Sequence, residues 1–147
     1  MRMSVGWRGL SMPVALAWLA LSGCGDSDRL PTVPVSGTLL IDGKPVSKGS
    51  IHFHPEKGRA ATGIVKDGSF TLSTYSDDDG GIAGKNRVAV EVVEQVPLKG
   101  GDTASKSLIA PNFSTPDESG IPIEIPAKGV QNLKIDIVGK GVKIDGV

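Results

Sequence analysis

The strongest constraint on the fold is a two-residue alternation of apolar and polar side chains that begins near residue 33. In the first such segment Val33, Val35, Leu39 and Ile41 fall on one face of an extended chain. This period is that of a β-strand with one buried face. Similar patterns predict strands at 50–54, 62–66, 69–74, 87–96, 121–125 and 133–138, with 143–144 as a candidate last edge pair.

Asp-Gly pairs separate several of these segments. Asp42-Gly43 follows the first strand and Asp67-Gly68 joins two others, and both residue types tolerate the positive φ of tight hairpin turns. About seven short strands without helical periodicity predict an all-β fold, a small antiparallel β-sandwich. Residues 76–85 and 97–120 are expected to be long loops.

Few aromatic residues are available to the predicted core. After Gly25 they are Phe53, Phe70, Phe113 and Tyr75, so Val, Ile and Leu must fill most of it. The alternation directs Phe53 and Phe70 inward, and these two rings should be the largest buried side chains.

The first 23 residues have a different character. Arg2 and Arg8 precede an apolar run at 10–21 of about a dozen residues, and small residues follow. This order is typical of a cleaved signal peptide, and the run is shorter than the roughly 20 residues of a spanning helix. The alternative, a buried first helix, has no helical pattern elsewhere in the chain to pack against.

Leu21-Ser22-Gly23-Cys24 closes this segment and resembles the lipobox of bacterial lipoproteins. The resemblance implies cleavage before Cys24 and lipid attachment to its thiol. An ordinary signal peptide ending near a chance cysteine is the alternative. Lipid chains at Cys24, the chain's single cysteine, would hold the protein on a membrane without a spanning helix. We therefore expect a signal peptide at 1–23, a lipidated tether at 24–32 and one domain at 33–147.

Composition excludes several functions. The 16 Lys+Arg balance 16 Asp+Glu, which argues against nucleic-acid binding. No nucleophile motif accompanies either histidine, and no P-loop or dinucleotide fingerprint is present, so we expect no enzyme activity and no cofactor.

The domain also resembles a known family. Val35-x-Gly37-x-Leu39, Asp42-Gly43-Lys44-Pro45-Val46, Gly49-Ser50-Ile51-x-Phe53 and Asp67-Gly68-x-Phe70-x-Leu72 resemble the carboxypeptidase regulatory-like domain. That resemblance implies a transthyretin-like (prealbumin-like) sandwich related to Ig-like folds, and a binding or scaffolding role. Asn86 departs from the pattern, because the family usually has Tyr there.

Two clusters could bind metals. His52 and His54 project from one strand face and should both be exposed, but a metal site needs a third ligand, so a solvated strand face is the alternative. Asp77-Asp78-Asp79 resembles part of a calcium loop, although the full spacing is missing and a solvated acidic loop is the alternative.

Taken together, the residues predict a non-catalytic lipoprotein of the cell envelope. Lipid on Cys24 would hold a monomeric domain on the non-cytoplasmic side of a membrane, where an envelope protein or glycan is its partner. The alternative function is a weak metal-binding periplasmic lipoprotein that uses His52 and His54.

Overall fold

The computed structural model describes residues 29–147. The expected signal peptide, the lipobox Leu21-Ser22-Gly23-Cys24 and most of the tether lie outside the described residues. No helix in the described part is long and apolar enough to cross a membrane.

The described residues form strands and one short 3-10 helix, which confirms the all-β prediction. The elements are β1 (Thr32–Val33), β2 (Val35–Ile41), β3 (Lys44–Pro45), β4 (Lys48–Pro55), β5 (Ala61–Lys66), β6 (Ser69–Ser73), β7 (Gly81–Ile82), β8 (Gly84–Glu91), β9 (Val93–Pro97), β10 (Thr103–Ser107), η1 (Pro111–Ser114), β11 (Pro122–Ile125), β12 (Val130–Val138) and β13 (Gly141–Asp145).

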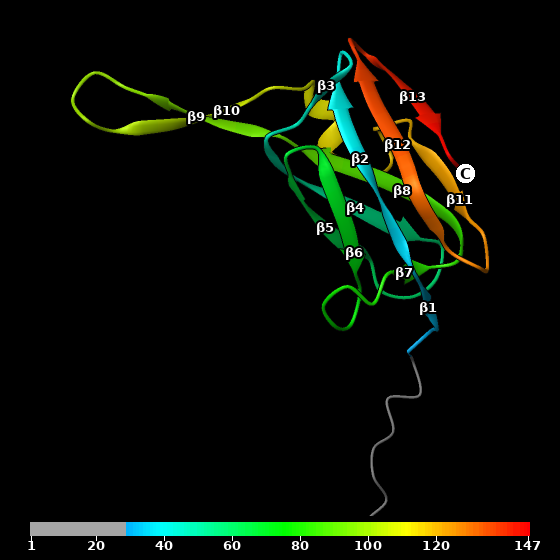
Figure 1. The fold of residues 1–147 in the computed structure, drawn as a ribbon. Coiled ribbons are helices and arrows are strands. Elements are labelled where there is room, and N and C mark those ends of the chain that lie inside the picture. Colours follow the sequence, from blue (N-terminus) through cyan, green and yellow to red (C-terminus); the bar gives the residue numbers. More distant parts are fainter. Residues whose placement is uncertain (1–28) are drawn as a thin grey trace, which may run out of the picture.

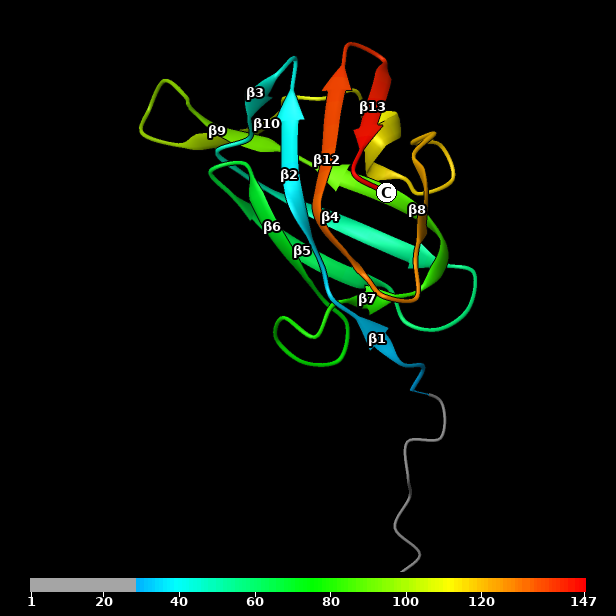
Figure 2. The ribbon, with the colours of Figure 1, turned by 45° about the vertical axis from the view of Figure 1, so that its right-hand side comes forward.

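Most strands belong to one curled sheet. Its order is β11-β8-β4-β5-β6-β2-β12-β13, and β3 pairs with the end of β2. The sheet curls so that β2, β12 and β13 lie across from β4, β5 and β8 (Figures 1 and 2). β1 pairs with β7, so regular structure begins at Thr32, inside the segment expected to be a tether.

Two tight turns agree with the sequence. Asp42 and Gly43 have φ of 50° and 76°, and Asp67 and Gly68 have φ of 49° and 82°. Both pairs therefore adopt the left-handed conformation for which Asp-Gly is suited, and the hairpin expected at Asp67-Gly68 joins β5 to β6.

One strand pair departs from the expected antiparallel arrangement. β2 and β12 run parallel, with Leu39 opposite Ile135, and this pair joins the first part of the chain to the last. A parallel pair needs a long connection, and here the intervening strands provide it. Gly37 allows the close approach, because a Cβ at that position would meet the Leu133 carbonyl oxygen.

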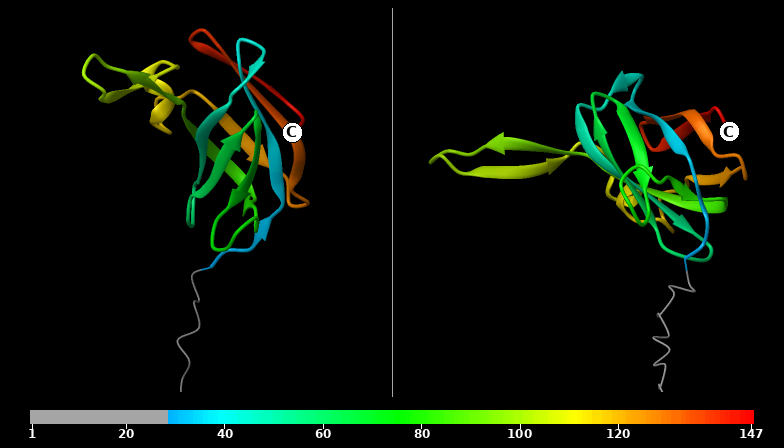
Figure 3. Two further views of the ribbon diagram at one scale, coloured as in Figure 1. Left: turned by 60° about the vertical axis from the view of Figure 1, so that its left-hand side comes forward. Right: turned by 60° about the horizontal axis from the view of Figure 1, so that its bottom comes forward.

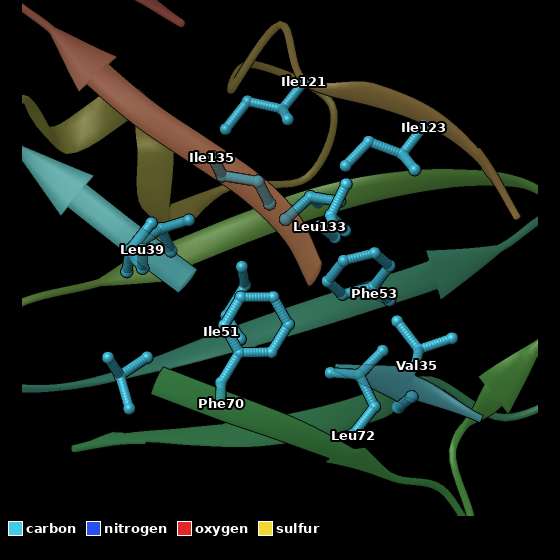
Figure 4. Close-up of a cluster of buried hydrophobic side chains, with 14 of the residues drawn as sticks. Val35, Leu39, Ile51, Phe53, Phe70, Leu72, Ile121, Ile123, Leu133 and Ile135 are labelled. Carbon is cyan, nitrogen blue, oxygen red and sulfur yellow. The ribbon is translucent and has the colours of Figure 1, made fainter. Parts of the chain in front are cut away.

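The core lies inside the curl and is mainly aliphatic. Ile51 and Phe53 are fully buried and Phe70 is 3% exposed, so the predicted inward face of these strands is confirmed. Figure 4 shows these side chains directed toward those of the facing strands β2 and β12. The labelled residues of the facing side are Val35, Leu39, Leu133 and Ile135.

The segment expected to be a loop at 97–120 is structured in part. It contains β10 and η1, and η1 places Phe113 in the core with no exposed surface. A single aromatic residue in a polar stretch gave no periodic signal, which is why the sequence did not predict its burial.

The strand expected at 87–96 is divided at Val92. Up to Glu91 the chain pairs with β4 as β8, and beyond Val92 it pairs only with β10 as β9. Val88, Val90 and Val92, which alternate with other residues along this run, are all buried. The run of β-branched residues therefore spans the point at which the chain leaves the curled sheet.

Candidate binding surface

A β-hairpin projects from the curled sheet and forms the most prominent surface feature. It consists of β9 and β10, paired from Val93 with Ser107 to Pro97 with Thr103. We call residues 93–107 the arm. Figures 1 and 3 show the arm extending sideways from the sheet, near the end of β2 that is farther from β1.

The arm turns at its tip through two glycines. Gly100 and Gly101 have φ of 115° and 92°, which other residues rarely adopt. The Leu98 N–H donates to the Asp102 carbonyl at 2.7 Å and closes the turn. The tip therefore has a specific hydrogen-bonded geometry.

Both faces of the arm are largely exposed. Only Val96 and Ala104, which lie opposite one another, are half-buried, and Val93 and Leu98 are each 51% exposed. A lone two-stranded hairpin is marginally stable in water. An arm of this kind gains stability when it contacts another surface.

A groove of about 590 Å³ lies where the arm leaves the sheet. The β2–β3 turn and the start of β4 form one wall, and β9 forms the other. Its apolar lining residues are Ile41, Pro45, Val46, Val92, Val93 and Leu108. Charged groups of both signs surround them, namely Asp42, Lys44, Lys48 and Glu94.

The groove walls are fixed by backbone hydrogen bonds. The Val46 N–H donates to the Leu39 carbonyl at 3.1 Å, and the Val46 carbonyl accepts from the Gly68 N–H at 2.7 Å. On the other wall the Leu108 N–H donates to the Val92 carbonyl at 2.9 Å. Leu108 itself is 48% exposed, so it presents apolar surface on a fixed backbone.

The two histidines lie on the outer face of β4, as predicted, but they are half-buried and not exposed. His52 Nδ1 lies 3.1 Å from Thr62 Oγ1, and His52 Nε2 lies 3.2 Å from Ser50 Oγ. Each ring nitrogen therefore has a hydroxyl partner, one from Thr62 on β5 and one from Ser50 on β4 itself. The prediction of exposure was wrong because neighbouring hydroxyl side chains cover this imidazole.

The pKa of His52 reflects this environment. Burial lowers the pKa of His52 below its usual 6.5, and the His54 imidazole lowers it further, while the Glu91 carboxylate opposes the shift. The neutral ring is thus favoured, which matches its hydrogen bonds to two hydroxyl groups. The described residues contain no group of three His, Cys, Asp or Glu side chains that could hold a metal ion.

The acidic loop contains a turn-stabilising carboxylate. Asp79 Oδ1 accepts the Thr74 N–H at 2.6 Å, and Asp79 Oδ2 accepts the N–H groups of Tyr75 at 3.0 Å and Ser76 at 3.1 Å. Burial alone would raise the pKa of Asp79, but these backbone donors hold it below its usual value. Both oxygens of Asp79 therefore bind the protein's own backbone and stabilise this turn.

Asn86, the departure from the family pattern, is buried and has a structural role. Its Nδ2 donates to the Ile82 carbonyl at 3.0 Å and to the Gly84 carbonyl at 2.9 Å. The amide thus holds the bend between β7 and β8. The next residue, Arg87, forms an ion pair on the surface with Asp117.

Comparisons with protein-family models, curated proteins and solved structures found no match for this chain.

Sequence reasoning did not identify the arm or the groove. The signal that was present is the glycine pair at 100–101 between two short segments rich in Thr, Ser and Val. Two such segments around Gly-Gly can form a hairpin, but residues 103–107 carry little of the apolar alternation that marks a half-buried strand.

Proposed function

We propose that this protein is a non-catalytic binding or scaffolding module of the bacterial cell envelope, anchored by lipid on Cys24. The arm and the groove at its base would form the surface that contacts an envelope protein or glycan. The observation that carries the proposal is the arm itself, a hairpin that packs little of its surface on its own domain.

The composition of the groove supports a binding role. Aliphatic side chains supply most of its lining, and a few charged groups at the rim can orient a partner. Neither His52 nor His54 lines this groove, and His52 is held by two hydroxyl groups on a different part of the sheet. These features suit recognition better than proton transfer.

We also propose that the domain is a carboxypeptidase regulatory-like, transthyretin-like sandwich. The residues on which the resemblance rests have clear structural roles in this chain. Gly37 permits the contact between β2 and β12, and Asp42-Gly43 and Asp67-Gly68 form left-handed turns. A transthyretin-like sandwich would need residues with these properties at its close strand contact and at its tight turns.

The position of β1 is compatible with a lipid anchor. Eight peptide steps separate Cys24 from Thr32, which allows a reach of roughly 25–30 Å. The Leu30 N–H donates to Tyr75 Oη at 3.1 Å, so the chain is already held to the domain just before β1. An anchor at Cys24 would keep this end of the domain near the membrane and the arm away from it.

The anchor is tested with the full-length protein in a bacterial host. We expect the wild type in the membrane fraction, with an intact mass that corresponds to cleavage before Cys24 and added acyl chains. Cys24→Ser should be released from membranes by a gentle wash. A free Cys24 thiol in the wild type would refute the anchor.

The binding surface is tested by site-specific photo-crosslinking in intact cells. A photoreactive residue at Gln95, in the groove, should give a discrete adduct with an envelope component. Ile64 is the matched control, because it is 58% exposed on β5 and lies outside the groove. Equal labelling from both positions would contradict a specific role for the groove.

A further inference from the structure

The outer edge of β10 is an open sheet edge. Within the described residues β10 pairs only with β9. The hydrogen bonds from Leu98 N to Asp102 O and from Leu108 N to Val92 O show which residue pairs bond inside the arm. Because bonding direction alternates along an antiparallel strand, the odd-numbered residues of β10 direct their backbone N–H and C=O groups outward. These residues are Thr103, Ser105 and Ser107.

The two edges of the arm are not equivalent. On β9 the outward positions include Pro97, which has no N–H, so one donor is missing from that edge. β10 contains no proline and retains a complete set of donors and acceptors over its length. β10 is therefore the edge of the arm that can accept a further strand.

The sequence of β10, taken with Asp102 just before it, is complementary to itself. When the strand is paired antiparallel with a second copy and Ala104 lies on the two-fold axis, Asp102 of each copy lies opposite Lys106 of the other. Thr103 then lies opposite Ser105, and both direct their backbone groups toward the partner strand. Opposite charges at facing positions stabilise such a pair, and the residues between them are small.

We propose that two copies of this protein associate by antiparallel pairing of their β10 strands, with Ala104 at the two-fold axis. The pairing makes a four-stranded sheet from two arms, a symmetric contact in which the same residues serve both copies. The groove remains available to another partner, because residues 103–107 do not line it.

This association rests on the proposed lipid anchor. A single pair of short strands gives weak binding, and confinement to one surface raises the local concentration of the second copy. The arm projects sideways from the domain (Figure 3), so neighbouring copies can bring their arms together. A released domain in dilute solution is still expected to be monomeric.

The first test introduces Ala104→Cys into the full-length protein and examines membranes under mild oxidation. In the proposed register Ala104 faces its own equivalent in a pair without backbone hydrogen bonds, where the two Cα atoms lie about 4.5 Å apart, within the range for a disulfide. We expect a disulfide-linked dimer. Gln95→Cys is the matched control, because it lies on the same exposed arm but on β9.

The second test changes the charges in the Ala104→Cys background. Asp102→Lys alone should abolish the dimer, because two lysines would then face each other. The double variant Lys106→Glu with Glu94→Lys should also abolish the dimer, because the glutamate introduced at position 106 would then face Asp102 of the other copy. Residues 94 and 106 face each other within the arm, so the double variant still places opposite charges there. Co-expression of the two variants should restore a crosslinked dimer that contains one copy of each.

The outcomes separate this inference from the proposed anchor. The acyl mass on Cys24 and the membrane fraction report the anchor independently of crosslinking. If the protein is anchored and Ala104→Cys forms no more dimer than Gln95→Cys, β10 pairing is refuted. Failure of the mixed charge variants to restore the dimer would refute the proposed register.

Discussion

The rings of Phe53 and Phe70 lie with their centroids 6.4 Å apart and their planes tilted by 41°, although their strands are not neighbours. β5 separates β4 from β6, and two of its three inward residues, Ala61 and Gly63, are small. Ala61 lies opposite Phe53, and Gly63 lies opposite Ile51 on one side and Leu72 on the other. The small residues of β5 thus make room for two aromatic rings to meet across it.

Truncating either ring should strongly destabilise the domain. Phe53→Ala and Phe70→Ala should each lower the free energy of unfolding by about 3–5 kcal/mol, the usual loss for a buried Phe. Urea denaturation of the wild type and variants measures this difference. Because the rings touch, the double variant should lower the free energy of unfolding by less than the sum of the two single losses.

His54→Ala is the control for this experiment. It lies on the opposite face of the same strand as Phe53, and it should change the free energy of unfolding by less than about 0.5 kcal/mol. A larger loss for His54→Ala than for Phe53→Ala would mean that the two faces of β4 are exchanged.

Gly63→Ala should also destabilise the domain, because β5 has no room for a larger residue at this position. An added Cβ would lie 3.0 Å from Ile51 Cγ2, 3.1 Å from Leu72 Cδ2 and 3.2 Å from the Thr71 carbonyl oxygen. We expect a loss of about 1–3 kcal/mol, typical of overpacking. Gly141→Ala is the matched control, because its nearest contact there is 3.7 Å, and it should be nearly neutral in urea denaturation.

Much of the fold could be predicted because it depends on local patterns. The alternation around Phe53 and Phe70 gave the buried face, and the Asp-Gly pairs gave the turns. The parallel contact of β2 with β12 could not be predicted, since alternation shows which face a strand buries but not which strand lies beside it.

The candidate binding surface was missed for a related reason. An exposed arm has no buried face, so residues 103–107 show little of the alternation that marks other strands. Val92 belongs to the same run as Val88 and Val90, and the sequence gives no sign that the chain leaves the sheet there. The histidines were placed on the correct face, but the hydroxyl contact at His52 comes from Thr62 of a neighbouring strand, which alternation along β4 does not reveal.

Asp79→Ala should destabilise the turn that follows β6. The carboxylate accepts three backbone N–H groups, and without it these donors lose their partner. We expect a loss of about 1–2 kcal/mol in urea denaturation. Asp77→Ala is the control, because Asp77 is exposed in the same loop and its removal should cost less than about 0.5 kcal/mol. Equal losses for the two variants would contradict the role assigned to Asp79.

The stability of the domain should fall as the pH is lowered through the range in which His52 titrates. The pKa of His52 is lowered in the folded protein, so the unfolded chain binds a proton more readily. The neutral His52 ring makes its full contribution to the free energy of unfolding above the unfolded-state pKa of 6.5. This contribution is lost as the pH falls through the lower pKa of the folded state. Protonation of Asp79 also lowers the free energy of unfolding as the pH falls, but this loss begins only near the usual Asp pKa of 3.8. Urea denaturation between pH 7.5 and pH 5 should therefore show a decline that His52→Gln removes and that His54→Gln, on the same face of β4, retains. If the free energy of unfolding of His52→Gln declined as much as that of the wild type, another titrating group would be responsible for the decline.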